Sequence, residues 1–497
     1  MQYGMVIDVI DKHIQNAFDS KRNLFLTGAA GTGKSTWLNK YIDEHENVLI
    51  CAPTGIAALN IGGDTMHRIF HIPVPAYDTP SFAKGKKGAI TQSMLSVIAN
   101  ADTVIVDEIS MARNDNFRFM IKVIRKAEKL KGSKIRIIVC GDFSQLPPVV
   151  KKNEVSLLKK FGLDPSGYAF TTQEWKSCNF KVIELTEVKR QSDIEFITHL
   201  NEIRVGNFTN LDYWNQFVNP EPDYENSIVI CGTNAKADEI NKNYLDELPG
   251  DLKVLQSVKQ GYVSAGYVDD IILVKEGCRI IFTANDTQYR NGKPRYQNGT
   301  FGIVKFVNTA EGYVVVTVNG EDIFVNPHVF SIYSYACSGS VLTKKELGSV
   351  TQYPFKVGKA ITIHKSQGQT FDNVIISPEI FAAGQLYVAL SRVRSPEGFT
   401  LLSELKPEYL IIDSNVKKFY DNNYTWEVKK KAVKKTAVKT MTKKQTSTVK
   451  KSTGKTAKPK TVKRRVAVKK SVGTRKSAVN KKTTSRVRKT SKRKCKK

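Results

Sequence analysis

Short apolar runs of strand length, separated by stretches with a helical pattern, recur through the first third of the chain. They are continuous and rich in β-branched residues, which is typical of strands buried on both faces of a sheet. The runs occupy residues 23–28, 47–53, 103–108 and 135–142, and the helical stretches include 34–45 and 114–130. This alternation predicts a doubly wound α/β fold. We assign residues 1–180 to this first domain, with 71–96, a segment rich in Pro and Lys, as a small insertion.

A second series of strand-like runs begins near residue 181 and predicts a second α/β domain. Its expected elements are strands at 227–234, 360–366, 373–377 and 399–404 and a helix at 385–393. We therefore expect the second domain to consist of residues 181–270 and 350–428.

Residues 271–349 interrupt this second series with a different pattern. Asn298-Gly299 and Asn319-Gly320 are hairpin-turn signals that separate short apolar runs. We predict that this segment forms a small antiparallel β-barrel inserted in the second domain.

Positive charge is concentrated at the end of the chain. Residues 429–497 contain 30 Lys and Arg and no acidic residue, whereas the other 428 residues hold 47 basic and 47 acidic ones. A segment of this composition cannot bury a core, so we predict a disordered tail that binds polyanions non-specifically. The run at 463–470 fits a nuclear localisation signal. The alternative for the tail is a solvated segment with neither duty.

The sequence carries none of the signals for secretion or membrane insertion. No apolar run approaches the roughly 18 residues that a spanning helix requires. The first 13 residues lack the basic and apolar regions of a signal peptide. The seven cysteines are scattered and form no CxxC pair, which favours a reducing compartment and argues against a structural zinc site. We therefore expect an intracellular protein without membrane association.

A glycine-rich loop lies between the first predicted strand and the first predicted helix. It reads Gly28-Ala29-Ala30-Gly31-Thr32-Gly33-Lys34-Ser35 and fits the phosphate-binding pattern G-x-x-x-x-G-K-[ST]. Backbone N–H groups of such a loop, and the helix N-terminus after it, face phosphate oxygens. We predict that Lys34 reaches the β- and γ-phosphates of ATP and that Ser35 holds Mg²⁺. The predicted nucleotide-binding set extends to Thr36.

Two further polar segments follow predicted strands. Asp107 and Glu108 end the run at 103–108, where Asp107 can complete the Mg²⁺ shell and Glu108 can activate the attacking water; the alternative is a helix N-cap pair. Gln145 follows the run at 135–142 and can sense the γ-phosphate, although this segment taken alone also fits a plain turn.

These motifs belong to an ordered series that resembles the PIF (petite integration frequency) family of superfamily-one DNA helicases, relatives of RecD. The series covers roughly residues 1–412. Its members are GAAGTGKS (28–35), APTGIAALNIGGDTMH (52–67), VDEIS (106–110), GDFSQLPPV (141–149), LTEVKRQSDIEFITHLNEIRVG (185–206), CGTNAKADEIN (231–241), QNGTFGIV (297–304), ITIHKSQGQTFDNV (361–374) and YVALSRVRS (387–395).

The resemblance implies two RecA-like P-loop domains with ATP between them and an SH3-like insertion. Arg190 and Arg392 are similar to the family's arginine fingers, which stabilise transition-state charge. Single-stranded or forked DNA would cross both domains. The positions that resemble the family's DNA contacts are Pro53, Thr54, Thr65, His67, Asn234, Thr362, His364 and Ser366.

The function implied by the resemblance is ATP-driven unwinding of DNA from five-prime to three-prime. The family serves replication, repair, recombination and telomere maintenance, so the nucleus or another site of DNA replication is the expected location. One alternative is a translocase that strips proteins from single strands without separating duplexes. Another is a nucleic-acid packaging protein whose active part is the basic tail and whose ATPase body is regulatory.

Overall fold

The computed structural model describes residues 12–73, 90–207, 210–263, 268–290, 293–338 and 341–423. The predicted tail at 429–497 lies outside the described residues, as do residues 74–89 of the predicted insertion at 71–96. A helix covers residues 12–19 at the start of the described part. Among the described helices, none is long and apolar enough to cross a membrane.

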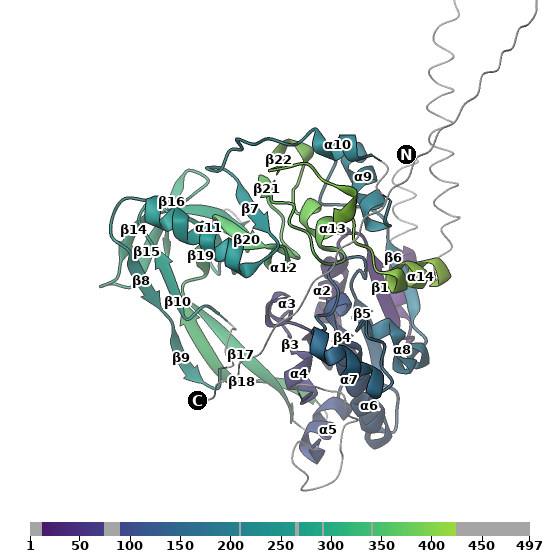
Figure 1. Cartoon of the computed structure of the whole chain (residues 1–497). Helices are drawn as coiled ribbons and strands as arrows, with labels where there is room; N and C mark the ends of the chain where they lie inside the picture. The colour runs from purple at the N-terminus through teal and green to yellow at the C-terminus, as the bar shows by residue number, and fades with distance from the viewer. Residues whose placement is uncertain are drawn as a thin grey trace, which may run out of the picture. The chain divides into compact units, whose positions relative to one another are not determined.

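The first sheet contains six parallel strands in the described part of the chain, in the order β3-β2-β4-β5-β1-β6 (Figure 1). Every residue of β1 and of β4 is buried, because helices cover both faces of the sheet. The prediction of a doubly wound sheet is therefore confirmed. The strands are β1 (Leu24–Gly28), β2 (Val48–Ala52), β3 (Asp64–Thr65), β4 (Thr103–Val106), β5 (Arg136–Cys140) and β6 (Lys181–Leu185).

Strand β6 corrects the predicted domain boundary. The sequence places residue 181 at the start of the second domain, but β6 pairs in parallel with β1 along its whole length, from Leu24 opposite Lys181 to Gly28 opposite Leu185. The first domain therefore extends through β6.

The helices of the first domain follow the strands in the expected alternation. The predicted helix at 114–130 is α6, whose left-handed C-cap Gly132 ends it. The end of the predicted insertion at 71–96 instead belongs to a helix, α5, that begins after the N-cap Thr91. The helices are α2 (Lys34–Glu44), α3 (Gly55–Asn60), α4 (Met66–Ile69), α5 (Gln92–Ala99), α6 (Asn114–Lys131), α7 (Val155–Lys160) and α8 (Gln173–Cys178), with 3-10 turns η1 (Ile109–Met111), η2 (Lys152–Glu154) and η3 (Ala169–Thr171).

The second sheet is also parallel, with the described strands in the order β20-β7-β21-β22. The run at 360–366, predicted as a single strand, divides at Thr362, whose hydroxyl accepts the Lys365 N–H and starts a helix. The strands are β7 (Ile228–Cys231), β20 (Ala360–Thr362), β21 (Val374–Ile376) and β22 (Phe399–Leu401). The helices are α9 (Ile194–Arg204), α10 (Leu211–Asn215), α11 (Asn234–Glu247), α12 (Ile363–Ser366), α13 (Gln385–Leu390) and α14 (Ser414–Asn423), with η4 (Pro396–Gly398) and η5 (Pro407–Tyr409).

The segment inserted in the second domain consists of antiparallel strands. Five of them form a sheet in the order β16-β15-β14-β11-β19, and further strands pair as β17-β18-β9, β8-β10 and β12-β13. The strands are β8 (Lys253–Gln256), β9 (Val258–Gly261), β10 (Ile271–Val274), β11 (Arg279–Phe282), β12 (Tyr289–Arg290), β13 (Lys293–Pro294), β14 (Phe301–Asn308), β15 (Tyr313–Val318), β16 (Glu321–Val325), β17 (His328–Ser338), β18 (Val341–Gln352) and β19 (Phe355–Val357). The insertion thus begins before residue 271 and ends after residue 349, so its predicted bounds are too narrow.

The longest strands of the insertion, β17 and β18, form a hairpin that contacts the first domain. The Ile50 N–H donates to the Tyr335 hydroxyl at 3.1 Å, and the Leu342 N–H donates to Oδ1 of Asn47 at 3.0 Å. The Lys344 ammonium donates to the Gly62 carbonyl at 2.6 Å. This hairpin therefore links the insertion to the edge of the first sheet at β2 and β3.

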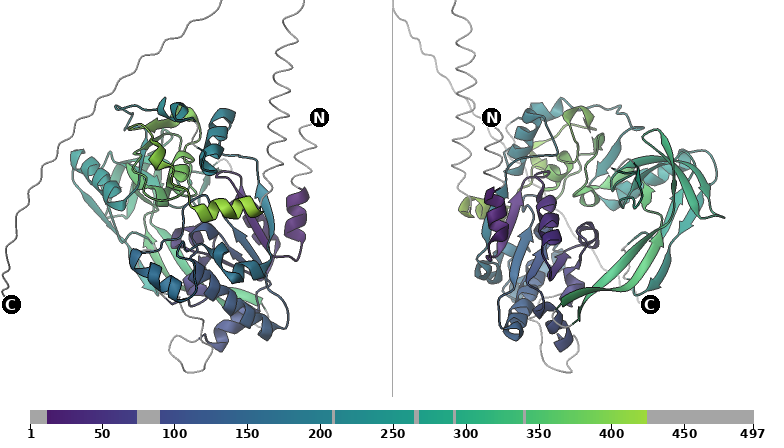
Figure 2. Two further views of the ribbon diagram at one scale, coloured as in Figure 1. Left: turned by 45° about the vertical axis from the view of Figure 1, so that its right-hand side comes forward. Right: turned by 180° about the vertical axis from the view of Figure 1, so that it is seen from behind.

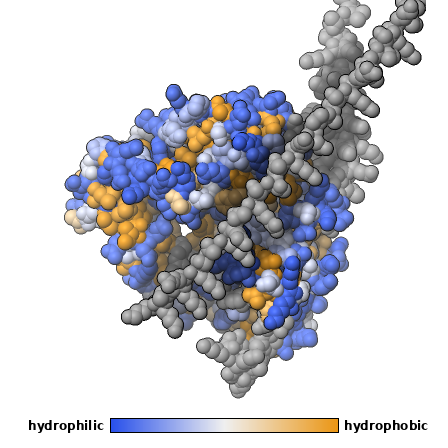
Figure 3. Space-filling view, in the orientation of Figure 1, coloured by the Kyte–Doolittle hydropathy of each residue, from blue (hydrophilic) through white to orange (hydrophobic). Residues whose placement is uncertain are grey.

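A small exposed apolar surface lies on the two-stranded sheet of the insertion. Val254 of β8 pairs with Leu273 of β10, and Ile271 lies two residues along the same strand. All three side chains are exposed, and orange residues gather over β8 and β10 in Figure 3.

The position of helix α14 shows that the predicted end of the second domain, at residue 428, is wrong. The helix follows β22 in the chain, but Phe419 packs among Phe25, Phe143 and Phe170 of the first domain. Figure 2 shows the yellow-green α14 against the strands of the first sheet. Residues 414–423, predicted as part of the second domain, therefore pack on the first.

Candidate functional site: the nucleotide and nucleic-acid edges of the two sheets

The glycine-rich loop leads from the buried strand β1 into α2. The left-handed Gly33 (φ 85°) is the N-cap of α2, and Lys34 is its first residue. The Lys34 ammonium donates to the carbonyl oxygens of Gly28 at 2.8 Å and Ala29 at 3.0 Å. Ser35 and Thr36 are exposed in the first turn of the helix. The ammonium, the hydroxyls and the backbone N–H groups therefore share one helix N-terminus, as phosphate binding requires.

Asp107 and Glu108 directly follow β4, two strands from β1 in the sheet. Oδ1 of Asp107 accepts the Glu108 N–H at 2.9 Å, and burial raises the pKa of Asp107. Glu108 adopts a left-handed conformation (φ 50°), which is uncommon for a residue with a side chain. Burial, followed by the charge of Asp107, raises the pKa of Glu108 to about 7, against the opposing charges of Lys34 and Arg392. A carboxyl group with such a pKa suits a general base at neutral pH.

Gln145 lies beside Glu108, and a residue that the sequence did not single out connects them. Nε2 of Gln367, which directly follows α12, lies 3.0 Å from Oε2 of Glu108 and 3.3 Å from Oε1 of Gln145, and it donates to both. Gln367 lies in the motif at 361–374, so its neighbours in the sequence were a signal for it. The second domain thereby contacts two predicted catalytic residues of the first.

The two predicted arginine fingers occupy different positions in this structure. Arg190 lies against the phosphate loop, because a Cβ at Gly31 would be 2.4 Å from the Arg190 Cβ, and the Lys189 N–H donates to the Gly31 carbonyl at 2.8 Å. Arg190 Nη1 also donates to the Ser391 carbonyl at 3.0 Å.

Arg392 is buried, with 1% of its surface exposed. Its guanidinium donates to the carbonyls of Val388 at 2.7 Å, Ser366 at 3.2 Å and Gln369 at 3.3 Å. In this structure the Cβ of Arg190 therefore lies beside the phosphate loop, whereas the guanidinium groups of both arginines donate to carbonyls of the second domain.

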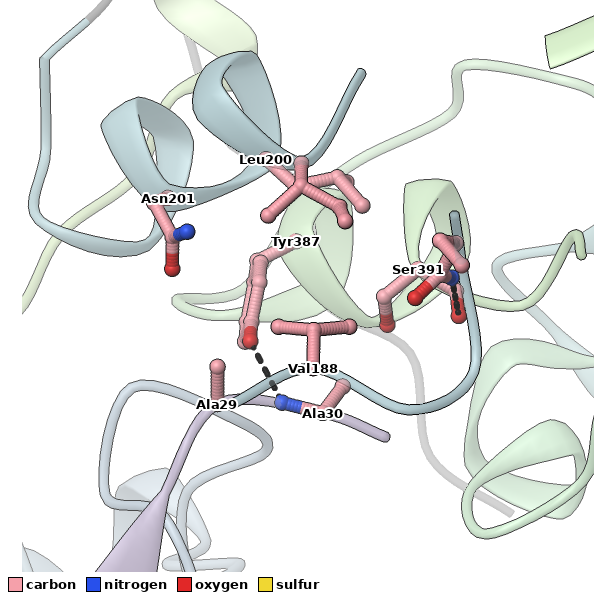
Figure 4. Close-up of a pocket in the computed structure, with 9 residues that line it drawn as sticks. Ala29, Ala30, Val188, Leu200, Asn201, Tyr387 and Ser391 are labelled. Carbon is pink, nitrogen blue, oxygen red and sulfur yellow. Dashed lines mark hydrogen bonds between the residues drawn. The ribbon is translucent and has the colours of Figure 1, made fainter. Parts of the chain in front are cut away.

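A tyrosine of the second domain also binds the phosphate loop directly. The Ala30 N–H donates to the Tyr387 hydroxyl at 2.8 Å, and Figure 4 shows the ring of Tyr387 pointing from α13 to the loop. The space beside this contact has a volume of about 10 Å³, close to the smallest that can hold one water. The junction between the phosphate loop, the linker (residues 186–193, between β6 and α9) and α13 is thus closely packed.

The residues at this edge fit ATP and Mg²⁺. Ser35 and Asp107 offer the hydroxyl and carboxylate oxygens that Mg²⁺ prefers beside phosphates. The charge of Lys34 opposes the raised pKa values of Asp107 and Glu108 and contributes to the lowered pKa of Asp142. The residues predicted to bind phosphate, to hold the cation and to act as the base therefore follow strands β1 and β4 at one edge of the sheet.

The predicted DNA contacts follow a different part of the same edge. The nucleotide residues follow β1, β4 and β5, whereas Pro53 and Thr54 follow β2, and Thr65 and His67 lie at the end of β3 and in α4. Thr54 and Thr65 are the N-caps of α3 and α4. Burial lowers the pKa of His67, so this imidazole is neutral at physiological pH.

In the second sheet, the predicted contacts also follow two adjacent strands. Asn234 follows β7 and is exposed, whereas Thr362 ends β20 and is buried. His364 is exposed in α12. The prediction that Ser366 contacts DNA is wrong. Its exposed fraction is 0% and its hydroxyl donates to the Ile363 carbonyl at 2.8 Å, so its side chain offers no group to a DNA strand.

The chain is similar to known helicases over most of its length. The model of the PIF1-like helicase family matches residues 4–213. The ATP-dependent DNA helicase Pif1 of Campylobacter jejuni is 31% identical over 442 residues, a match that covers 80% of this chain and 94% of the relative.

Two solved structures of Bacteroides Pif1 are similar in fold as well as in sequence. The complex with ADP-AlF4 has a TM-score of 0.72 at 30% identity and covers 84% of this chain and 96% of that one. The complex with single-stranded DNA has a TM-score of 0.59 at 31% identity and covers 83% and 96%. The parallel α/β sheets described above are those of RecA-like helicase domains, and the chain belongs to the PIF1-like helicase family.

Proposed function

We propose that this protein is an ATP-dependent DNA helicase that moves from five-prime to three-prime on single-stranded DNA and unwinds duplexes. The observation that carries the proposal is the bridge from Gln367 to Glu108 and Gln145. It joins the predicted water-activating base and the predicted γ-phosphate sensor to α12, the helix that also carries a predicted DNA contact, His364. ATP state and grip on DNA would be coupled through this element.

The residues of the site divide the hydrolysis step among them. Lys34 and the N–H groups of the loop would bind the phosphates, and Ser35 and Asp107 would hold Mg²⁺. The cation would neutralise charge between phosphate oxygens. Glu108, deprotonated, would orient and deprotonate the attacking water, while Arg190 stabilises the developing charge from the linker side. Both arginines would first have to release their present carbonyl partners, Arg190 that of Ser391 and Arg392 those of Val388 and Ser366.

We propose that the DNA strand binds where β2 and β3 of the first sheet and β7 and β20 of the second sheet end. One stretch of the DNA strand would contact Pro53, Thr54, Thr65 and His67, and the next would contact Asn234 and His364. Thr362, predicted as a contact, is buried and would support His364 as the N-cap of α12. Closure of the two RecA-like domains around ATP would change the distance between these grips, and their alternation would move the chain along DNA. We further propose that the insertion is SH3-like and covers the strand, and that the basic tail binds DNA phosphates non-specifically.

Single-stranded DNA stimulation of ATP hydrolysis tests the proposal. We expect the rate of the full-length protein to rise with added oligonucleotide, and Lys34→Ala and Glu108→Gln to abolish the stimulated rate. Removal of a group from a catalytic set of this kind costs about 10²–10⁴-fold in kcat. A rate that ignores DNA would favour the packaging alternative, in which the ATPase body is only regulatory.

A further inference from the structure

Helix α14 (Ser414–Asn423) returns the chain from the second sheet to the first domain. Phe419 stacks on Phe170 with a centroid distance of 4.4 Å and an interplanar angle of 25°, and its ring lies 5.3 Å from that of Phe143. Both partners belong to the first domain, and Phe143 is part of the motif that carries Gln145. The helix is thus anchored behind the predicted γ-phosphate sensor.

The next residue along α14 contacts this motif through hydrogen bonds. The Tyr420 side chain is buried, its hydroxyl donates to Oδ1 of Asp142 at 2.9 Å, and it accepts the Phe143 N–H at 3.0 Å. Asp142 also stabilises the turn formed by residues 142–145. Its carboxylate accepts the Ser144 N–H at 3.1 Å, and its carbonyl accepts the Gln145 N–H at 2.9 Å.

The buried guanidinium of Arg204, from α9, also binds the Asp142 carboxylate. Nε of Arg204, at the end of α9, lies 2.9 Å from Oδ2 of Asp142, and the exposed fractions of the two side chains are 4% and 0%. Nη1 of Arg204 also donates to Glu184 of β6 at 3.1 Å. The α9 residues Phe196 and Leu200 pack in the core of the second domain. The Asp142 carboxylate is therefore held from α14 and from the second domain at once.

We propose that the hydroxyl of Tyr420 makes it a positioning residue for Gln145, through the turn at Asp142. This inference rests on the proposed helicase function. Without the hydroxyl, the Phe143 N–H would be buried without a partner and the Asp142 carboxylate would lose one donor, so only Arg204 and the bonds within the turn would hold the segment before Gln145. Gln145 would then lose its alignment with Gln367 and Glu108.

The test compares Tyr420→Phe with Phe419→Leu. The first removes only the hydroxyl, whereas the second weakens the aromatic anchor of the same helix and keeps the hydroxyl. For each protein we would measure the unfolding midpoint and the kcat and KM for ATP at saturating single-stranded DNA. We would also measure the ratio of oligonucleotide Kd values without nucleotide and with ADP and aluminium fluoride.

We expect Tyr420→Phe to lower kcat about tenfold, with KM within about twofold, because one buried hydrogen bond to a charged group is lost. The ratio of Kd values should move towards one. Phe419→Leu should lower the unfolding midpoint at least as much and keep the wild-type ratio.

Two results would overturn the inference: a kcat and a ratio in Tyr420→Phe equal to those of the wild type, or an equal loss of both in Phe419→Leu. A wild-type protein whose ATP hydrolysis ignores DNA would instead refute the proposed function itself.

Discussion

Gly384 lies where the second domain meets the Gln145 segment, and its replacement by alanine gives a sharp prediction. Gly384 is the left-handed N-cap of α13, with φ 73°. A Cβ at this position would lie 2.2 Å from the Gln145 carbonyl oxygen and 2.8 Å from that of Ser144. Both obstacles are backbone atoms, so no side-chain rotation can relieve the clash.

The magnitude follows from this geometry. An ordinary contact between carbon and a carbonyl oxygen is about 3.3 Å or longer. Gly384→Ala must therefore move α13 away from Gln145 by about 1 Å, and α13 carries Tyr387, the partner of the phosphate loop. A misplacement of about 1 Å can cost on the order of 100-fold in rate. The left-handed conformation adds about 1–2 kcal/mol of destabilisation for any residue with a Cβ.

Gly250 provides a control that separates the steric clash from the cost of a left-handed backbone conformation. Gly250 has φ 90° and no atom within 4 Å of a Cβ built on it, so Gly250→Ala carries only the conformational cost. We expect both variants to unfold at lower temperature, but only Gly384→Ala to lose about 100-fold in the kcat of DNA-stimulated ATP hydrolysis. If Gly384→Ala kept a kcat within about threefold of that of Gly250→Ala, the close approach of α13 to Gln145 would have no role in the reaction.

Three other predictions concern the predicted base Glu108, the hydrogen bonds from Gln367 to Glu108 and Gln145, and the basic tail at 429–497. The pKa of Glu108 is raised to about 7 and the base acts deprotonated, so kcat should rise as pH increases through about 7 and level off above it; a rate that is flat over this range would contradict the assignment. Gln367→Ala should lower kcat about tenfold, because Glu108 and Gln145 lose their shared donor, and should leave oligonucleotide binding without nucleotide unchanged; a drop in binding measured by fluorescence anisotropy would point to a DNA contact instead. A protein ending at Tyr424 should bind DNA more weakly at low salt with a smaller salt dependence, yet keep its kcat at saturating DNA; unchanged low-salt binding would refute the role of the tail.

The sequence was sufficient wherever the signal is local. Strand β4 is one continuous β-branched run, buried at every position, and the glycine loop is recognised by its own spacing. Pairing between distant segments was not predictable. Only the register of β6 with β1, which pairs Lys181 with Leu24, assigns β6 to the first sheet.

The hairpin of β17 and β18 escaped prediction for a different reason. Most residues of β18 from Val341 to Glu346 are exposed, so the strand shows no alternation of apolar and polar side chains there. Its partners are in the first domain, at Asn47, Ile50 and Gly62, and a single sequence carries no sign of them.

In the candidate site, too, residues in local motifs were predictable and residues brought together from distant segments were not. The sequence identified Lys34, Glu108 and Gln145 from motifs at strand ends. It did not identify Gln367, whose amide is 259 positions from Glu108, or Tyr420, whose hydroxyl is 278 positions from Asp142. It also could not show that Ser366 points inward, because burial depends on how α12 packs.

The most direct test of the central claim is strand displacement with ATP and Mg²⁺ on two otherwise identical duplexes, one with a five-prime and one with a three-prime single-stranded overhang. Lys34→Ala is the control for strand exchange driven by the basic tail. A helicase of the proposed polarity displaces the strand only from the five-prime overhang, and the variant displaces none. Displacement from the three-prime overhang, or displacement that survives in Lys34→Ala, would contradict the account.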